Sequence, residues 1–183
     1  MNLVIGSPWW LIGFLIVALI AAAIEDTVRF KISNLTCAAV LVAALAAMAM
    51  HGFSTSLWQN WAIAIGILVI GTPAFSAGWF GGGDVKLLAA TGLWINLKAV
   101  LGLISAVFIV GGVVALIYIV ARRFSGSAQG TKSRDRRVPY GLAIVAGAVF
   151  VFATQLTERP TNPFIERMKA MQAKPSAPGV RPF

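Results

Sequence analysis

The feature that most constrains this chain is its division into long apolar segments that contain almost no charge. Hydrophobic residues make up 58% of the 183 residues and charged residues only 11%, whereas soluble domains carry roughly one quarter charged residues. The apolar segments cover residues 9–24, 35–50, 61–75, 87–95, 99–120 and 138–156. Segments of this length match the thickness of a bilayer better than a single soluble core. The pattern excludes a soluble enzyme and predicts an all-α integral membrane protein.

Six transmembrane helices follow from these segments. A helix needs about 20 residues to cross the hydrocarbon region, so the short fourth segment spans only if its helix begins near Asp84 and continues to about Leu97. We expect a polytopic membrane domain over residues 1–156 and a basic, proline-containing, mostly disordered tail over residues 157–183. Cleavage of the first segment as a signal peptide is the alternative, but no basic residue precedes that segment.

The net charge of +9 is concentrated in two places. Six basic residues lie within 122–137 and five more in the tail, while the link over residues 51–60 has no lysine or arginine. Cytoplasmic loops of membrane proteins are enriched in basic residues, so we interpret the clustering as a topology signal and not as a nucleic-acid surface. The links after the first, third and fifth helices are then cytoplasmic. Both termini lie on the opposite side, which leaves the basic tail on the disfavoured side.

The chain offers few ligands for a metal or a cofactor. Cys37 is its single cysteine and His51 its single histidine. One cysteine can form neither an intrachain disulfide nor a thiolate pair for zinc. We therefore expect no metal and no cofactor.

Two aspartates at helix ends are the candidate catalytic groups. Asp26 ends the first expected helix and Asp84 opens the fourth, so a six-helix topology brings both to the cytoplasmic side. Two neighbouring carboxylates can share a proton, and such a pair can draw a proton from water while it polarises a peptide carbonyl. Taken singly, each has a simpler explanation. Asp26 could pair with Arg29 at the interface, and Asp84 could cap its helix as the N-cap residue.

Three glycines precede the second aspartate. Gly81, Gly82 and Gly83 lack Cβ atoms, so an extended substrate backbone could approach Asp84 closely. Lys86 could neutralise the acid pair or bind an acid of the substrate, or its side chain could extend to the membrane surface. A phosphate-binding loop is excluded, because an anion would meet Asp84 and Lys86 is at the wrong spacing for a P-loop. Gly141 and Gly147 are interpreted as positions of close helix packing.

Three stretches together resemble a known family. Asp-Thr-Val-Arg-Phe-Lys-Ile-Ser-Asn at 26–34, Gly-Gly-Gly-Asp-Val-Lys at 81–86 and Val-Pro-Tyr-Gly at 138–141 resemble the signature regions of prepilin peptidases, the type IV leader peptidases among the GxGD membrane aspartyl proteases. The resemblance implies that Asp26 and Asp84 are the catalytic pair. Ser33 stands where the family usually has proline, which puts the local stiffness of the chain in doubt.

The resemblance also implies a function and a location. The expected activity is that of an aspartic endopeptidase that removes the leader from prepilin-like precursors at the cytoplasmic face of a bacterial inner membrane. The short form resembles the peptidases of Flp pili of the tight-adherence type. Neither the length nor the paired cysteines of the larger members are present, so no methyltransferase activity is expected. A prepilin-like protein and the lipid bilayer are the expected partners.

Two other functions remain open at this point. Paired acids in a membrane also form proton relays, so a small proton-coupled transporter is one alternative. A membrane subunit of pilus or secretion assembly is the other. The residues that bind the leader and the oligomeric state are not predicted.

Overall fold

The computed structural model describes residues 2–52, 54–124 and 140–157. Within these ranges every regular element is a helix. The elements are α1 (Leu3–Gly6), α2 (Trp9–Arg29), α3 (Asn34–His51), the single 3-10 turn η1 (Thr55–Leu57), α4 (Trp58–Ser76), α5 (Gly82–Gly92), α6 (Leu97–Phe124) and α7 (Tyr140–Thr157). Among the described residues, five helical segments are long and apolar enough to cross a membrane: α2, α3, α4 together with η1, α6 and α7. The expected all-helical, multi-pass membrane protein is confirmed, while the tail and most of the basic cluster lie outside the described residues.

Helix α5 is shorter than the expected membrane span. It begins at Gly82 and ends at Gly92, so its 11 residues rise about 16 Å, roughly half of the hydrocarbon thickness. The prediction of a span that continues to about Leu97 is therefore wrong. The chain leaves the helix at residue 93, and α6 begins at Leu97.

The chain that follows α5 has its backbone groups satisfied inside the bundle. The side-chain amide of Asn60 on α4 donates to the carbonyls of Leu93 at 2.7 Å and Ile95 at 3.1 Å. The amide of Leu3 in α1 donates to the carbonyl of Trp94 at 3.1 Å. All five side chains are fully buried or nearly so. Non-helical backbone is tolerated at membrane depth only where such partners exist, so Asn60 and α1 allow the short helix to end inside the protein.

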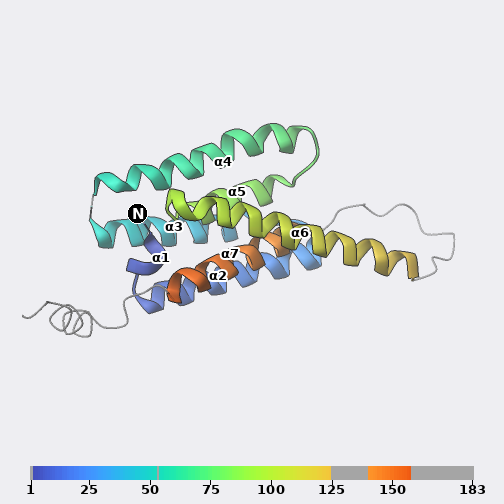
Figure 1. The fold of residues 1–183 in the computed structure, drawn as a ribbon, viewed down its shortest axis with the longest axis horizontal. Coiled ribbons are helices and arrows are strands. Elements are labelled where there is room, and N and C mark those ends of the chain that lie inside the picture. The colour runs from blue at the N-terminus through green and yellow to red at the C-terminus, as the bar shows by residue number, and fades with distance from the viewer. Residues whose placement is uncertain (1, 53, 125–139, 158–183) are drawn as a thin grey trace, which may run out of the picture.

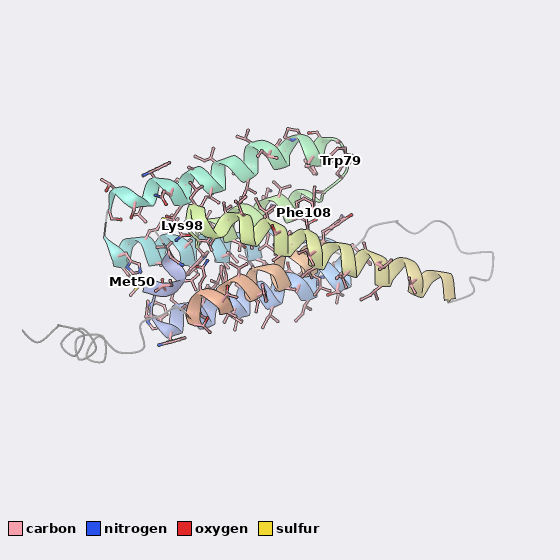
Figure 2. All side chains as sticks on the ribbon, viewed as in Figure 1. Met50, Trp79, Lys98 and Phe108 are labelled. Carbon is pink, nitrogen blue, oxygen red and sulfur yellow. The ribbon has the colours of Figure 1, made fainter. Side chains whose placement is uncertain are left out.

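Successive helices from α2 to α7, the short α5 included, run in alternating directions (Figure 1). Helix α7 packs against α2 and α6, α5 packs against α3 and α4, and α3 also packs against α2. The end of α2 and the starts of α5 and α7 consequently meet at one end of the bundle (Figure 1). Trp79 marks this end and Lys98 the opposite one (Figure 2), and we call them the Trp79 end and the Lys98 end.

Apolar side chains cover the outside of the bundle. On α6 the side chains of Leu101, Phe108 and Ile109 are 72%, 66% and 68% exposed, and Phe108 is labelled on this helix in Figure 2. Water would disfavour such a surface by about 25 cal/mol for each Å², whereas lipid does not. The outer faces of the helices are therefore fitted to the bilayer.

The turn between α2 and α3 is held by Glu25. Its carboxylate accepts hydrogen bonds from the Ser33 amide at 2.8 Å, the Ser33 hydroxyl at 3.2 Å and the Thr36 hydroxyl at 2.9 Å. Ser33 is also the N-cap of α3, because its Oγ accepts from the Thr36 amide at 3.1 Å. Through these contacts Glu25 fixes the turn that follows Asp26.

The first prediction concerns Ser33, where the family pattern favours proline. The Ser33 φ of −72° suits proline, but proline has no amide hydrogen for Glu25 and no hydroxyl for the cap. Ser33→Ala removes the hydroxyl, with its cap and its 3.2 Å hydrogen bond to Glu25, but keeps the amide, and it should lower the free energy of unfolding by about 1 kcal/mol. Ser33→Pro should lower it by about 1 kcal/mol more, because it also loses a hydrogen bond to a charged acceptor. Thermal unfolding in detergent measures both, and a Ser33→Pro protein as stable as the parent would contradict the assigned role of Glu25.

The second prediction concerns orientation. Reporters inserted within residues 125–137 should report the cytoplasm, and reporters inserted within residues 54–57 should report the opposite compartment. The physical reason is that Arg29, Lys31 and Lys86 lie at or next to the helix ends of the Trp79 end. The reverse result would place the Trp79 end outside the cell.

Candidate functional site

A cavity of about 870 Å³ opens at the Trp79 end of the bundle. Four helix ends contribute to its wall: the last turn of α2, the last turn of α4, the start of α5 and the first residue of α7. The turns before α3 and before α5 complete it. Its lining residues are Asp26, Phe30, Lys31, Ile32, Phe75, Gly78, Trp79, Phe80, Gly81, Gly82, Gly83, Asp84, Lys86 and Tyr140. All six candidate site residues from the sequence, Asp26, Asp84, Gly81, Gly82, Gly83 and Lys86, are therefore brought to one cavity.

Asp26 is held by the start of α7. It lies in the last turn of α2 and is only 5% exposed. Its Oδ2 accepts a hydrogen bond from the amide of Gly141 at 2.7 Å, and the amide of Leu142 is a second donor. The first amides of a helix have no partner within the helix and carry its positive dipole end. Asp26 thus meets the backbone of α7 and is not committed to an interfacial pair with Arg29.

The contact between Asp26 and α7 depends on the absence of a side chain at Gly141. A Cβ atom at this position would lie 2.9 Å from both Cβ and Cγ of Asp26 and 2.8 Å from Cδ1 of Ile32. Distances this short require one of the elements to move. The interpretation of Gly141 as a position of close packing is confirmed, and the group against which it packs is Asp26 itself.

Asp84 has a different environment. It is the third residue of α5 and is 8% exposed. Its Oδ2 accepts from the amide of Gly81 at 3.1 Å, so it caps the helix from within its first turn. The helix begins at Gly82, and the expectation that Asp84 opens it as the N-cap residue is wrong. Its Oδ1 is buried and has no hydrogen-bond partner among the described residues.

The two carboxylates interact through their charges. They line the same cavity, and the negative charge of Asp26 acts on Asp84. Two like charges in a partly desolvated site are costly to keep together. The arrangement therefore favours a state in which the pair holds one proton between two acids.

The glycines before Asp84 are in contact with the protein's own atoms. A Cβ at Gly81 would lie 2.7 Å from Oδ2 of Asp84, and one at Gly83 would lie 3.0 Å from Cβ and from the carbonyl oxygen of Ile32. Packing within the protein therefore explains the absence of side chains at Gly81 and Gly83, whether or not a substrate binds there. The approach of a substrate backbone to Gly81, Gly82 and Gly83 stays a prediction.

Lys86 links two elements at the rim of the cavity. Its Nζ donates to Oδ1 of Asn34 at 2.9 Å, which joins the start of α5 to the start of α3. The sequence had suggested neutralisation of the acid pair, binding of a substrate acid or extension to the membrane surface. The observed bond adds a fourth role, which is to hold these two helix ends together.

Aromatic residues that sequence reasoning had not singled out complete the wall. The rings of Phe80 and Tyr140 lie 5.4 Å apart, at an interplanar angle of 53°, and join the turn before α5 to the start of α7. Phe30 ends α2 in a left-handed conformation, with φ of 52°. Only the resemblance at residues 138–141 pointed to Tyr140, while Pro139 lies outside the described residues.

The chemistry available to this site is that of two carboxylic acids. The described residues contain no group of three or more His, Cys, Asp or Glu side chains that could hold a metal ion. Two carboxylates on opposing helix ends can take a proton from one reactant and give a proton to another.

The sequence that forms this site is similar to that of known proteins. The model of the type IV leader peptidase family matches residues 13–116, a stretch that includes Asp26 and Asp84 and ends before α7. A prepilin leader peptidase/N-methyltransferase of Xanthomonas campestris pv. campestris is 38% identical over 82 residues, which are 43% of this chain and 25% of that protein. No solved structure matches the chain. Because the family match covers more than half of the residues and includes both buried aspartates, the chain belongs to the type IV leader peptidase family.

Proposed function

We propose that this chain is a membrane aspartic endopeptidase that removes the leader peptide from prepilin-like precursors. The observation that carries the proposal is the presence of two buried carboxylates, Asp26 from α2 and Asp84 from α5, on the wall of one cavity. Membership of the type IV leader peptidase family and the name of the Xanthomonas relative support the same activity.

The proposed reaction uses the pair as acid and base. One carboxylate takes a proton from a water molecule as the water oxygen attacks the scissile carbonyl carbon. The other, protonated, acid donates to the carbonyl oxygen. Collapse of the tetrahedral intermediate breaks the C–N bond, and the leaving amine takes up a proton. A site at the end of the bundle can receive water from the bulk phase, so the proposal requires no water channel.

The position of the cavity suits a substrate that crosses the membrane boundary. A precursor with a basic leader and a following apolar helix would keep the helix in the bilayer and present its leader at the cytoplasmic surface. Its scissile bond would then lie at the depth of Asp26 and Asp84. The basic residues Arg29, at the end of α2, and Lys31, just after it, support a cytoplasmic Trp79 end, and we propose the bacterial inner membrane as the location.

Two finer parts of the proposal rest on the sequence and not on the structure. The first is that the substrates are pilins of the Flp type. The second is that this chain does not carry the methyl transfer named for the Xanthomonas relative. Both stay predictions about the chain.

The proton-coupled transporter remains the alternative from another class. A relay usually needs a series of polar or acidic groups through the membrane. Within residues 2–52, 54–124 and 140–157, Asp26 and Asp84 are the only buried acidic side chains, and both lie at the Trp79 end. We therefore favour the peptidase. An assembly subunit has no comparable need for two buried acids.

The third prediction tests the pair by substitution. Asp26→Asn and Asp84→Asn should each lower cleavage of a prepilin-like precursor by about 10³-fold or more, because an amide can neither accept the proton of water nor share one. The double variant should lose little beyond either single variant, since members of one catalytic unit are strongly non-additive. Cleavage is measured on membranes with equal amounts of each variant.

The matched control removes the neighbouring acid. Glu25→Gln changes the charge by the same amount, but Glu25 does not line the cavity and glutamine can still accept from the Ser33 amide. This variant should retain most activity. Cleavage near the parent rate in either aspartate variant would reject the aspartic mechanism and favour the transporter or the assembly subunit.

A further inference from the structure

The two aspartates face unequal sets of donors. Asp26 accepts from two amides at the start of α7, those of Gly141 at 2.7 Å and Leu142. Asp84 accepts from one amide, that of Gly81 at 3.1 Å, and its buried Oδ1 has no partner among the described residues. Backbone amides stabilise an ionised carboxylate, whereas a buried oxygen without a donor suits a carboxyl group that carries the proton itself.

From this asymmetry we infer that Gly141 is a positioning residue that makes Asp26 the ionised base of the pair and leaves the shared proton on Asp84. The inference rests on the proposed function, because it assigns roles within that reaction. Gly141 does this in two ways: its amide donates to Asp26, and its missing side chain leaves room for the carboxylate. The family match ends at residue 116, so it says nothing about Gly141.

The assignment gives a complete proton balance. Asp26 takes one proton from water as the water oxygen bonds to the scissile carbon, and Asp84 gives its proton to the carbonyl oxygen. Asp26 is then protonated and Asp84 ionised. On collapse the C–N bond breaks, Asp26 returns its proton to the leaving nitrogen, and one hydroxyl of the tetrahedral carbon returns a proton to Asp84. Both acids end in their starting states.

Other charged and titratable groups also face the pair. Lys31 from the turn before α3, Lys86 from α5 and Tyr140 from α7 line the cavity, and Cys37 of α3 donates from Sγ to the Gly83 carbonyl at 3.7 Å. Arg29 is in the same last turn of α2 as Asp26. The proposed test leaves all five unchanged, so their effects are common to every variant.

The pH profile of kcat/KM separates the two aspartates. Activity requires one proton on the pair, so the acid limb reports the first ionisation and the alkaline limb the second. If the single proton resides on Asp84, Asp26 carries its negative charge both before and after the second ionisation of the pair. A change in the donors of Asp26 then moves only the acid limb, and a change in the donor of Asp84 moves only the alkaline limb.

The fourth prediction uses two matched glycine substitutions. A Cβ at Gly141 displaces Asp26 from its donors, and a Cβ at Gly81 displaces Asp84 from its donor. Loss of a donor disfavours the ionised form. Gly141→Ala should therefore move the acid limb to higher pH by about half a unit to one unit and leave the alkaline limb in place. Gly81→Ala should move only the alkaline limb to higher pH. Gly13→Ala, at an exposed site on α2 with open space around the added carbon, should move neither.

An infrared titration covers the case in which a variant is folded but inactive. The carboxyl bands of each protein, measured against the Asp26→Asn/Asp84→Asn double variant, report the two ionisations without turnover. The inference is overturned if Gly141→Ala moves the second ionisation and Gly81→Ala the first, or if neither substitution moves its assigned step. Either result leaves the proposed function standing, provided that the parent protein cleaves the precursor. Absence of cleavage by the parent would reject the proposed function instead.

Discussion

The hydrogen bond from the Gly141 amide to Asp26 joins residues 115 positions apart in the chain, and the candidate site depends on it. A carboxylate at the end of an apolar bundle is costly unless donors replace the water that it has lost. Helix α7 supplies those donors without any charged side chain. The same contact fixes the start of α7 against α2, because a side chain at Gly141 would collide with Asp26. The contact that packs α7 against α2 is thus also the contact that supplies a hydrogen-bond donor to Asp26.

The short helix α5 is the second constraint. A helix that crossed the whole bilayer would also deliver Asp84 to the Trp79 end, but α5 stops after 11 residues and leaves carbonyls at membrane depth. Asn60 and Leu3 satisfy the carbonyls of Leu93, Trp94 and Ile95. These contacts, together with the bond from Lys86 to Asn34 at the other end of the helix, hold α5 between α3 and α4. The position of Asp84 is therefore set from both ends of its helix.

The sequence made the acids easy to find and their donors hard to find. In a chain with six acidic residues, an aspartate at the end of an apolar segment stands out, and the alternation of helix directions brings Asp26 and Asp84 to one end. The amides of Gly141 and Leu142 carry no such signal, since every residue except proline has an amide. The length of α5 was misjudged because an apolar run after Gly92 can be buried by protein as well as by lipid. The role of Glu25 was missed because its partners are Ser33, where the chain departs from the family pattern, and Thr36 in the first turn of α3.

In the proposed reaction, Asp26 and Asp84 act as one unit on a tetrahedral carbon. The sharpest measurement of this is the affinity of a prepilin-like peptide in which a hydroxyethylene unit, CH(OH)–CH2, replaces the scissile amide CO–NH, compared with the same peptide carrying CH2–CH2 there. The parent protein should bind the alcohol at least about 100-fold more tightly, as expected of a mimic of the transition state. This preference should disappear equally in Asp26→Asn and in Asp84→Asn. Equal affinity of the parent for both peptides, or a preference that survives either substitution, would contradict joint action of the two aspartates.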